Sequence, residues 1–165
     1  MDKKHLRFPG AIVFSLFTAI IVTLLPLPNL IAAWKPEWVV LTLIHWAIIM
    51  PKRSSLLLAW FCGLLIDSLF ASSSILGQHA FGFVIVTFFA IRFSERINPQ
   101  AIWQQAFMIL IILGTYLLIN LWILGVTGKS PSSWSYWFPL LSSLLVWPLW
   151  HFLLNKLHLH RKVAL

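Results

Sequence analysis

The stretch from Trp60 to Ala80, WFCGLLIDSLFASSSILGQHA, places one acidic residue near the end of an apolar run. That residue is Asp67, and a serine run with Gly77 follows it before the chain becomes apolar again. Carrying a carboxylate into a bilayer costs about 2.5–3.5 kcal/mol on insertion scales. If the run lies in a membrane, Asp67 therefore needs a partner or a function there.

The composition of the whole chain is that of an integral membrane protein. Of its 165 residues, 60% are hydrophobic and 10% are charged, whereas a soluble domain carries about 25% charged residues. So few charged side chains cannot cover a globule with a polar surface. The net charge of +8 is spread singly or in small groups between apolar runs, so we expect no nucleic-acid partner. A single cysteine, Cys62, excludes an intrachain disulfide.

Six apolar runs divide the chain, and we expect one membrane domain covering residues 1–165. The expected transmembrane spans are residues 11–33, 37–50, 55–70, 79–92, 103–126 and 134–155. The first run also resembles a secretory signal peptide, but it is long enough to cross a bilayer, and we expect an uncleaved helix. The second run is short, so a re-entrant loop is the alternative to a short full span.

The distribution of basic residues predicts the orientation of these spans. If the N-terminus is cytoplasmic, all of the 12 lysines and arginines except Lys35 and Lys129 fall on the inner side. Cytoplasmic loops of membrane proteins carry such an excess of basic residues. We therefore expect an all-α polytopic protein with about six transmembrane helices and both termini in the cytoplasm.

The sequence lacks the arrangements typical of enzymes, and we expect no catalytic residues, metal or cofactor. Aspartyl hydrolysis needs two carboxylates that share a site, but Asp67 is the only acid in the interior of an expected span. The Gly-x-Ser-x-Gly motif of serine hydrolases is missing. Serines 72–74 near His79 are typical of a loop, and His158 with His160 is typical of a solvated basic tail rather than a metal site.

Polar residues are expected to gather at the outer ends of the spans. Asp67 and Asn120 lie about 18 Å and about 25 Å up their helices at 1.5 Å per residue, and Gln78 and His79 begin the fourth helix on the same side. We expect these four side chains to form one hydrogen-bonded cluster. A structural role and direct contact with a ligand or partner both remain open. His45 is interpreted as a histidine packed alone rather than a proton relay.

Several short motifs follow one another along the chain. They are Lys35-Pro36-Glu37-Trp38, His45-Trp46, Met50-Pro51-Lys52-Arg53, Gly63-Leu-Leu-Ile-Asp67, Leu76-Gly77-Gln78-His79-Ala80, Trp103-Gln104-Gln105-Ala106 and Val146-Trp147-Pro148. In this order the set resembles the bacterial MreD family of rod shape-determining proteins. The resemblance covers most of the chain, from Pro36 to Pro148.

The resemblance implies a non-enzymatic, multi-pass protein of the bacterial inner membrane that belongs to the cell-elongation machinery. It would bind MreC and act with MreB, with RodA and its penicillin-binding-protein partner, and with membrane lipids, in lateral peptidoglycan synthesis. It also implies a fold similar to the substrate-binding S components of vitamin transporters.

The alternative function is that of a substrate-binding membrane subunit of a small-molecule transporter. Such a subunit should have an enclosed, outward-facing pocket lined by polar groups. A scaffold should instead show a groove or an apolar patch at lipid depth. For the cluster itself, we expect Asp67→Asn to lower the folded level more than Ser73→Ala does.

Overall fold

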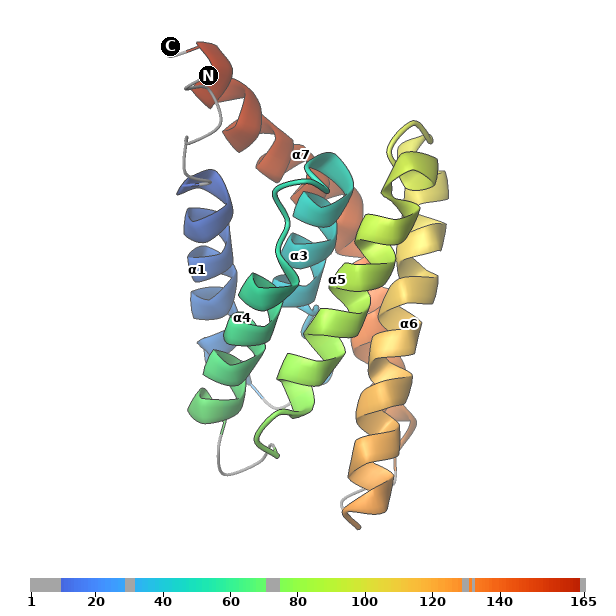
Figure 1. Cartoon of the computed structure of the whole chain (residues 1–165). Helices are drawn as coiled ribbons and strands as arrows, with labels where there is room; N and C mark the ends of the chain where they lie inside the picture. Colours follow the sequence, from blue (N-terminus) through green and yellow to red (C-terminus); the bar gives the residue numbers. More distant parts are fainter. Residues whose placement is uncertain (1–9, 29–31, 71–74, 129–130, 132, 164–165) are drawn as a thin grey trace.

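The computed structural model describes residues 10–28, 32–70, 75–128, 131 and 133–163, and only the backbone of residues 158–163. These residues are all-helical, without a strand (Figure 1). The helices are α1 (Gly10–Leu24), α3 (Trp38–Ile49), α4 (Leu56–Leu69), α5 (Gln78–Ile97), α6 (Ile102–Val126) and α7 (Phe138–Val163), with the 3-10 turn η2 (Trp134–Trp137) directly before α7.

Successive helices run in alternating directions, so the start of α1 and the end of α7 lie at the same end of the bundle (Figure 1). Five exposed basic residues belong to segments that lie towards this end, namely Lys52, Arg53, Arg92, Arg96 and Lys156. The connection that carries Lys35 lies at the opposite end. The geometry agrees with the separation of charge along the sequence, while the cytoplasmic placement of the basic end stays a prediction.

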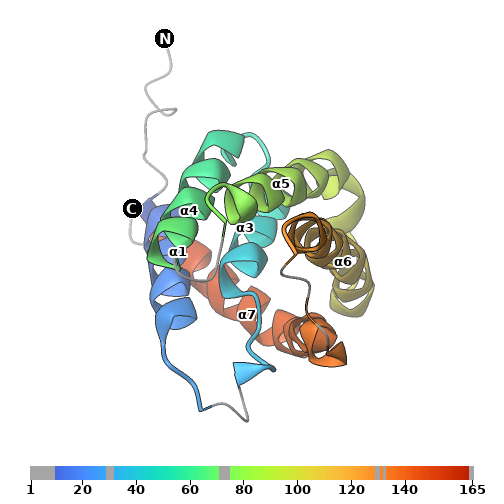
Figure 2. The same ribbon diagram turned by 90° about the horizontal axis from the view of Figure 1, so that it is seen from below.

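Helix α3 forms the centre of the bundle (Figure 2). Its residues 39–48 are all buried, and it packs against α1, α5 and α7. A helix that is apolar all round is expected to be buried on all sides. Its 12 residues give only about 18 Å of helix, but its sides face protein rather than lipid. Its shortness therefore does not create a mismatch with the bilayer.

The observed helices differ in length from the expected spans. Helix α1 ends at Leu24, well before residue 33, because Pro26 and Pro28 lack the N–H groups that would continue the helix and disfavour helical geometry in the residues before them. Helix α5 instead continues past residue 92 to Ile97. By length and composition, α6 and the segment Trp134–Leu157 can cross a membrane, whereas α1, α3 and α4 are shorter apolar helices. The number of spans stays a prediction.

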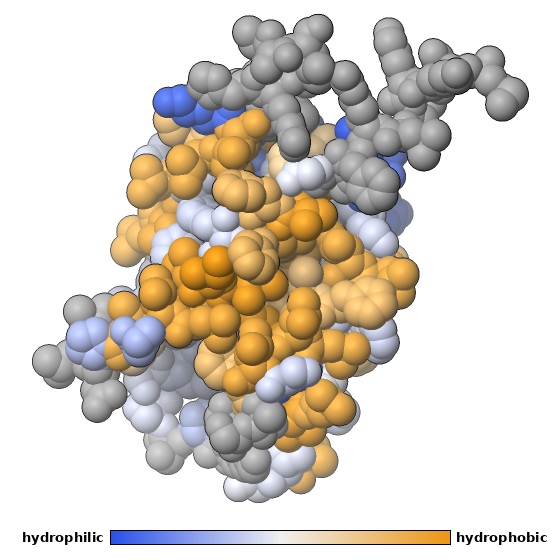
Figure 3. Space-filling view, turned by 90° about the vertical axis from the view of Figure 1, so that its left-hand side faces the viewer, coloured by the Kyte–Doolittle hydropathy of each residue, from blue (hydrophilic) through white to orange (hydrophobic). Residues whose placement is uncertain are grey.

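Large apolar side chains cover the outer faces of the helices. On α1 and α4, six of them are between 53% and 62% exposed: Phe14, Phe17, Leu57, Phe61, Leu65 and Leu69. Figure 3 shows this face as a broad apolar surface through the middle of the molecule. A monomeric soluble protein rarely exposes a patch of this kind, and a membrane supplies the apolar surroundings that it needs. The described surface is therefore that of a membrane protein.

Candidate functional site

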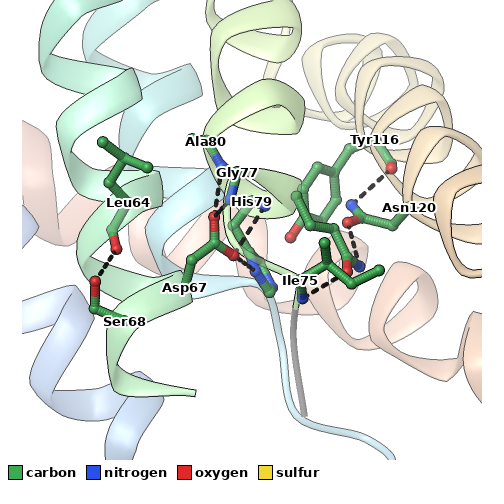
Figure 4. A network of polar contacts seen from close by, with 10 residues as sticks. Leu64, Asp67, Ser68, Ile75, Gly77, His79, Ala80, Tyr116 and Asn120 are labelled. Atoms are coloured by element: carbon green, nitrogen blue, oxygen red, sulfur yellow. Dashed lines mark hydrogen bonds and ion pairs between the residues drawn. The ribbon is translucent and has the colours of Figure 1, made fainter. Parts of the chain in front are cut away.

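Asp67 lies in the last turn of α4, and its carboxylate faces the start of α5 (Figure 4). The residue is 1% exposed. Its Oδ2 accepts hydrogen bonds from the backbone N–H groups of Gly77 at 2.8 Å and Ala80 at 3.4 Å, and its Oδ1 accepts one from the N–H of His79 at 3.2 Å. The first N–H groups of a helix have no acceptor within that helix. Asp67 therefore caps α5 from a neighbouring helix.

Gly77, the N-cap residue of α5, explains why the cap comes from outside. Its φ of +94° lies in the left-handed region, which glycine adopts readily because it has no Cβ. The same lack of a side chain means that Gly77 cannot cap the helix itself. The negative charge of Asp67 also suits this position, because the N-terminus of a helix carries a partial positive charge.

Gly63 brings the backbones of α4 and α5 into contact, one helical turn before Asp67. A Cβ at position 63 would lie 2.2 Å from the Cα and 2.4 Å from the N of Ala80. Residues four apart share one face of a helix, so the same close approach lets the short side chain of Asp67 reach the start of α5. Gly63 and Asp67 thus act together.

The four residues expected in one cluster do meet at the first turn of α5, but they form two pairs. Nδ1 of His79 lies 2.7 Å from Oδ1 of Asp67, to which the ring N–H donates. Gln78 faces the other neighbour, and its Nε2 donates to Oδ1 of Asn120 on α6 at 2.9 Å. Asn120 in turn donates to the backbone carbonyl of Tyr116 at 3.0 Å. These four side chains, Asp67, Gln78, His79 and Asn120, tie α5 to α4 on one side and to α6 on the other, and we call them the α5 joint.

The chemistry of the α5 joint is that of hydrogen bonding between protein groups. Within the described ranges, no three His, Cys, Asp or Glu side chains are grouped so that they could hold a metal ion. Serines 72–74 lie outside the described residues. The choice between a structural role and direct contact with a ligand or partner stays a prediction for these side chains.

A pocket of about 370 Å³ lies beside the α5 joint, between the facing ends of α1, α3, α4, α5 and α6. Phe70 and Phe83 are two of its apolar walls, and its polar lining consists of Thr23, Lys35, Glu37, Gln78 and His79. Lys35 and Glu37 were not expected to take part in a site. In the sequence they stood out only as part of the motif Lys35-Pro36-Glu37-Trp38.

Lys35 is directed at the C-terminal end of α1. Its Nζ donates to the backbone carbonyl of Thr23 and, at 3.2 Å, to that of Leu25. Carbonyl groups in the last turn of a helix lack partners within the helix and carry partial negative charge, so an ammonium group stabilises them. Burial lowers the pKa of Lys35 from its ordinary value, and the charge of Glu37 opposes this shift.

A second set of polar contacts joins α3 to α7. The indole N–H of Trp150 donates to the hydroxyl of Thr42 at 3.0 Å. The Nδ1 atoms of His45 and His151 are 3.1 Å apart, and Nε2 of His151 is 2.9 Å from Nδ2 of Asn155. The interpretation of His45 as a histidine packed alone is therefore wrong. Its partner is 106 residues away, and no local spacing in the sequence signals the pair.

Two buried threonines, Thr42 in this α3–α7 contact and Thr87 on α5, should respond differently to replacement by valine. Thr42→Val should lower the unfolding free energy by about 1 kcal/mol, because the half-buried indole of Trp150 loses its acceptor. Thr87→Val should leave the unfolding free energy unchanged or raise it slightly, since the hydroxyl of Thr87 has no hydrogen-bond partner in the described part of the chain. Thermal unfolding of the detergent-solubilised variants compares the two. Equal losses would show that the Trp150 contact contributes nothing.

The comparisons with known proteins agree on one family. The family model described as rod shape-determining protein MreD matches residues 3–157 of the chain. The rod shape-determining protein MreD of Haemophilus influenzae is 27% identical over 150 residues, which cover 89% of this chain and 88% of that protein. No solved structure matches the chain. The expected similarity to transporter S components therefore stays a prediction.

Proposed function

Because the chain belongs to the MreD family of rod shape-determining proteins, we propose that it is a multi-pass scaffold of the bacterial inner membrane that binds MreC and supports lateral peptidoglycan synthesis. The family match over residues 3–157 carries this proposal. MreD proteins are membrane proteins with a role in rod shape determination, and they are not a known enzyme family. MreB, RodA and the penicillin-binding-protein partner of RodA would join through the same complex.

The surface of the bundle supports a role in packing against other membrane proteins. Helices α5 and α6 form an open apolar groove of about 270 Å³, and its lining includes Phe89, Phe93, Met108 and Ile111. Helices associate within a bilayer through close side-chain packing rather than through exclusion of water. A concave apolar face of this kind offers a partner helix more contact than a convex one does. It is the feature expected of a scaffold.

The alternative of a transporter subunit is supported by the pocket beside the α5 joint. Its volume of about 370 Å³ falls in the range of small-molecule sites, about 300–1,000 Å³. The family match favours the scaffold, so we do not propose transport.

Depletion of this protein in its host tests the scaffold proposal. Rod-shaped cells should become spherical as the protein disappears, and expression of the wild-type chain should restore the rods. Cell length and width in micrographs measure the outcome. Normal rods after a clean deletion, with no paralogue present, would contradict the role in shape.

Co-purification tests the partner separately from cell shape. A tagged, functional copy of the chain should recover MreC from native membranes solubilised in mild detergent. Loss of rods without recovery of MreC would leave the family role standing and would remove direct MreC binding from the proposal.

A further inference from the structure

The pocket beside the α5 joint contains the carboxylate of Glu37, which has no hydrogen-bonding partner among the described residues. Glu37 lies directly before α3, and its backbone N–H donates to the hydroxyl of Ser143 at 3.0 Å. Its side chain makes no capping hydrogen bond to α3, and it accepts no hydrogen bond from any residue that the structure describes. The residue is half-buried. A carboxylate partly withdrawn from water gains free energy when a hydrogen-bond donor or a cation reaches it.

The other polar groups that line the pocket are already engaged. Lys35 uses two of its three N–H donors on the carbonyls of Thr23 and Leu25. The amide N–H of Gln78 donates to Asn120. The ring of His79 donates from Nδ1 to Asp67, so in the neutral ring its Nε2 is left as an acceptor. One N–H of Lys35 and one of Gln78 stay available as donors, and the acceptors left to a ligand are the carboxylate of Glu37 and Nε2 of His79.

The apolar walls suit the same kind of ligand. Phe70 comes from the end of α4 and Phe83 from the second turn of α5, and both line the pocket. The face of an aromatic ring attracts a cation through its quadrupole. An ammonium group with a compact apolar body would place its three donors at Glu37 and His79 and its body against the two rings.

From this arrangement we propose that the pocket binds a primary ammonium group carried on a compact apolar body, with Glu37 as its counter-ion. The ammonium group has two possible sources, a soluble organic amine or the ethanolamine headgroup of a phospholipid. Both supply the same chemistry to the pocket. The inference rests on the pocket alone and does not depend on the scaffold role.

The test uses the full chain in nanodiscs made of phosphatidylglycerol only, which contain no amine. Phenethylammonium chloride should raise the thermal midpoint in a saturable way, because a ligand that binds the folded state stabilises it. The midpoint is read by far-ultraviolet circular dichroism. Two compounds with a similar apolar body serve as controls: 3-phenylpropionate is negatively charged and 2-phenylethanol is uncharged. At the same concentrations, both should leave the thermal midpoint unchanged.

Glu37→Gln is the decisive variant, and Glu95→Gln is its matched control. Removing the carboxylate should weaken binding of phenethylammonium about tenfold or more, as expected for the loss of a hydrogen bond to a charged group. Glu95 is exposed on α5 and does not line the pocket, so Glu95→Gln should bind as the wild type does. If Glu37→Gln unfolds before ligand is added, Glu37→Asp, which keeps the charge, should fold and retain binding.

Two further nanodisc preparations identify the source of the amine. If phosphatidylethanolamine in the discs raises the midpoint and suppresses the effect of phenethylammonium, the headgroup occupies the pocket. If it does neither while phenethylammonium still binds, the ligand is a soluble amine. An equal response to the amine and to 3-phenylpropionate, an effect that survives Glu37→Gln, or no stabilisation by either source would overturn the proposal.

Discussion

Among substitutions of glycine by alanine within the described helices, Gly63→Ala should destabilise the folded chain most. The new Cβ would lie 2.2 Å from the Cα of Ala80 and 2.4 Å from its N, which is far inside any tolerated contact. Both atoms belong to the backbone, so no side-chain rotation relieves the clash and α4 must move away from α5. Overpacking of this kind costs roughly 1–3 kcal/mol, and the displaced Asp67 would lose its hydrogen bonds to α5 as well.

A glycine of α6 provides the control, and Ala80 provides a diagnostic double variant. Gly114 lies within α6, and a Cβ added there meets nothing within 4 Å. Gly114→Ala should therefore leave the thermal midpoint unchanged or raise it, because alanine favours a helix interior over glycine. Ala80→Gly should not rescue Gly63→Ala, since the clash involves atoms that glycine keeps. Rescue by Ala80→Gly, or equal midpoints for Gly63→Ala and Gly114→Ala, would contradict the close approach of α4 and α5.

Much of the bundle follows from patterns that are local in the sequence. The apolar runs predicted where helices occur, and the alternation of basic residues predicted that Asp67, Gln78, His79 and Asn120 share one end of the molecule. The end of α1 could also have been predicted from the sequence, because Pro26 lies two residues after its last residue, Leu24. The expected first span, residues 11–33, is too long because it follows the apolar run past two prolines that end the helix.

The pairing of side chains depends on distances that the sequence does not contain. Gln78 and His79 are adjacent, yet they face α6 and α4 respectively, because successive residues of a helix are separated by about 100°. Their separation into two pairs follows from the positions of both neighbouring helices. The close approach at Gly63 had a weak signal, since glycine within a helix often reflects packing. The contact between His45 and His151 had none, because it depends on how α7 packs across α3.

Asp67→Asn is the second change with a large expected effect, and it should lower the unfolding free energy by about 2 kcal/mol. Asparagine nearly preserves the shape of the side chain, so the change leaves no cavity. Both carboxylate oxygens accept hydrogen bonds, Oδ2 from the N–H groups of Gly77 and Ala80, and Oδ1 from His79. In either orientation of the amide, its NH₂ group would face donors, and at least one contact would become repulsive.

Ser68→Ala is the matched control for this prediction, because Ser73 lies outside the described residues. Ser68 follows Asp67 on α4 and is exposed, and its hydroxyl donates within its own helix to the carbonyl of Leu64 at 2.8 Å. Its loss should change the unfolding free energy by less than about 0.5 kcal/mol, as for surface positions in general. The folded level in membranes and the thermal midpoint in detergent measure both variants. Equal, small effects would mean that the charge at Asp67 does not hold α5.

A double-mutant cycle then separates the cap on the helix from the contact with the ring. If Asp67 acts through both the backbone N–H groups and His79, then Asp67→Asn should cost more than His79→Gln. The double variant should cost less than the sum, because the two side chains share one contact. Full additivity would mean that the 2.7 Å contact contributes nothing to stability. The carboxylate of Asp67 would then hold α5 only through the backbone N–H groups of Gly77, His79 and Ala80, and its contact with α5 would be a helix cap supplied by a neighbouring helix.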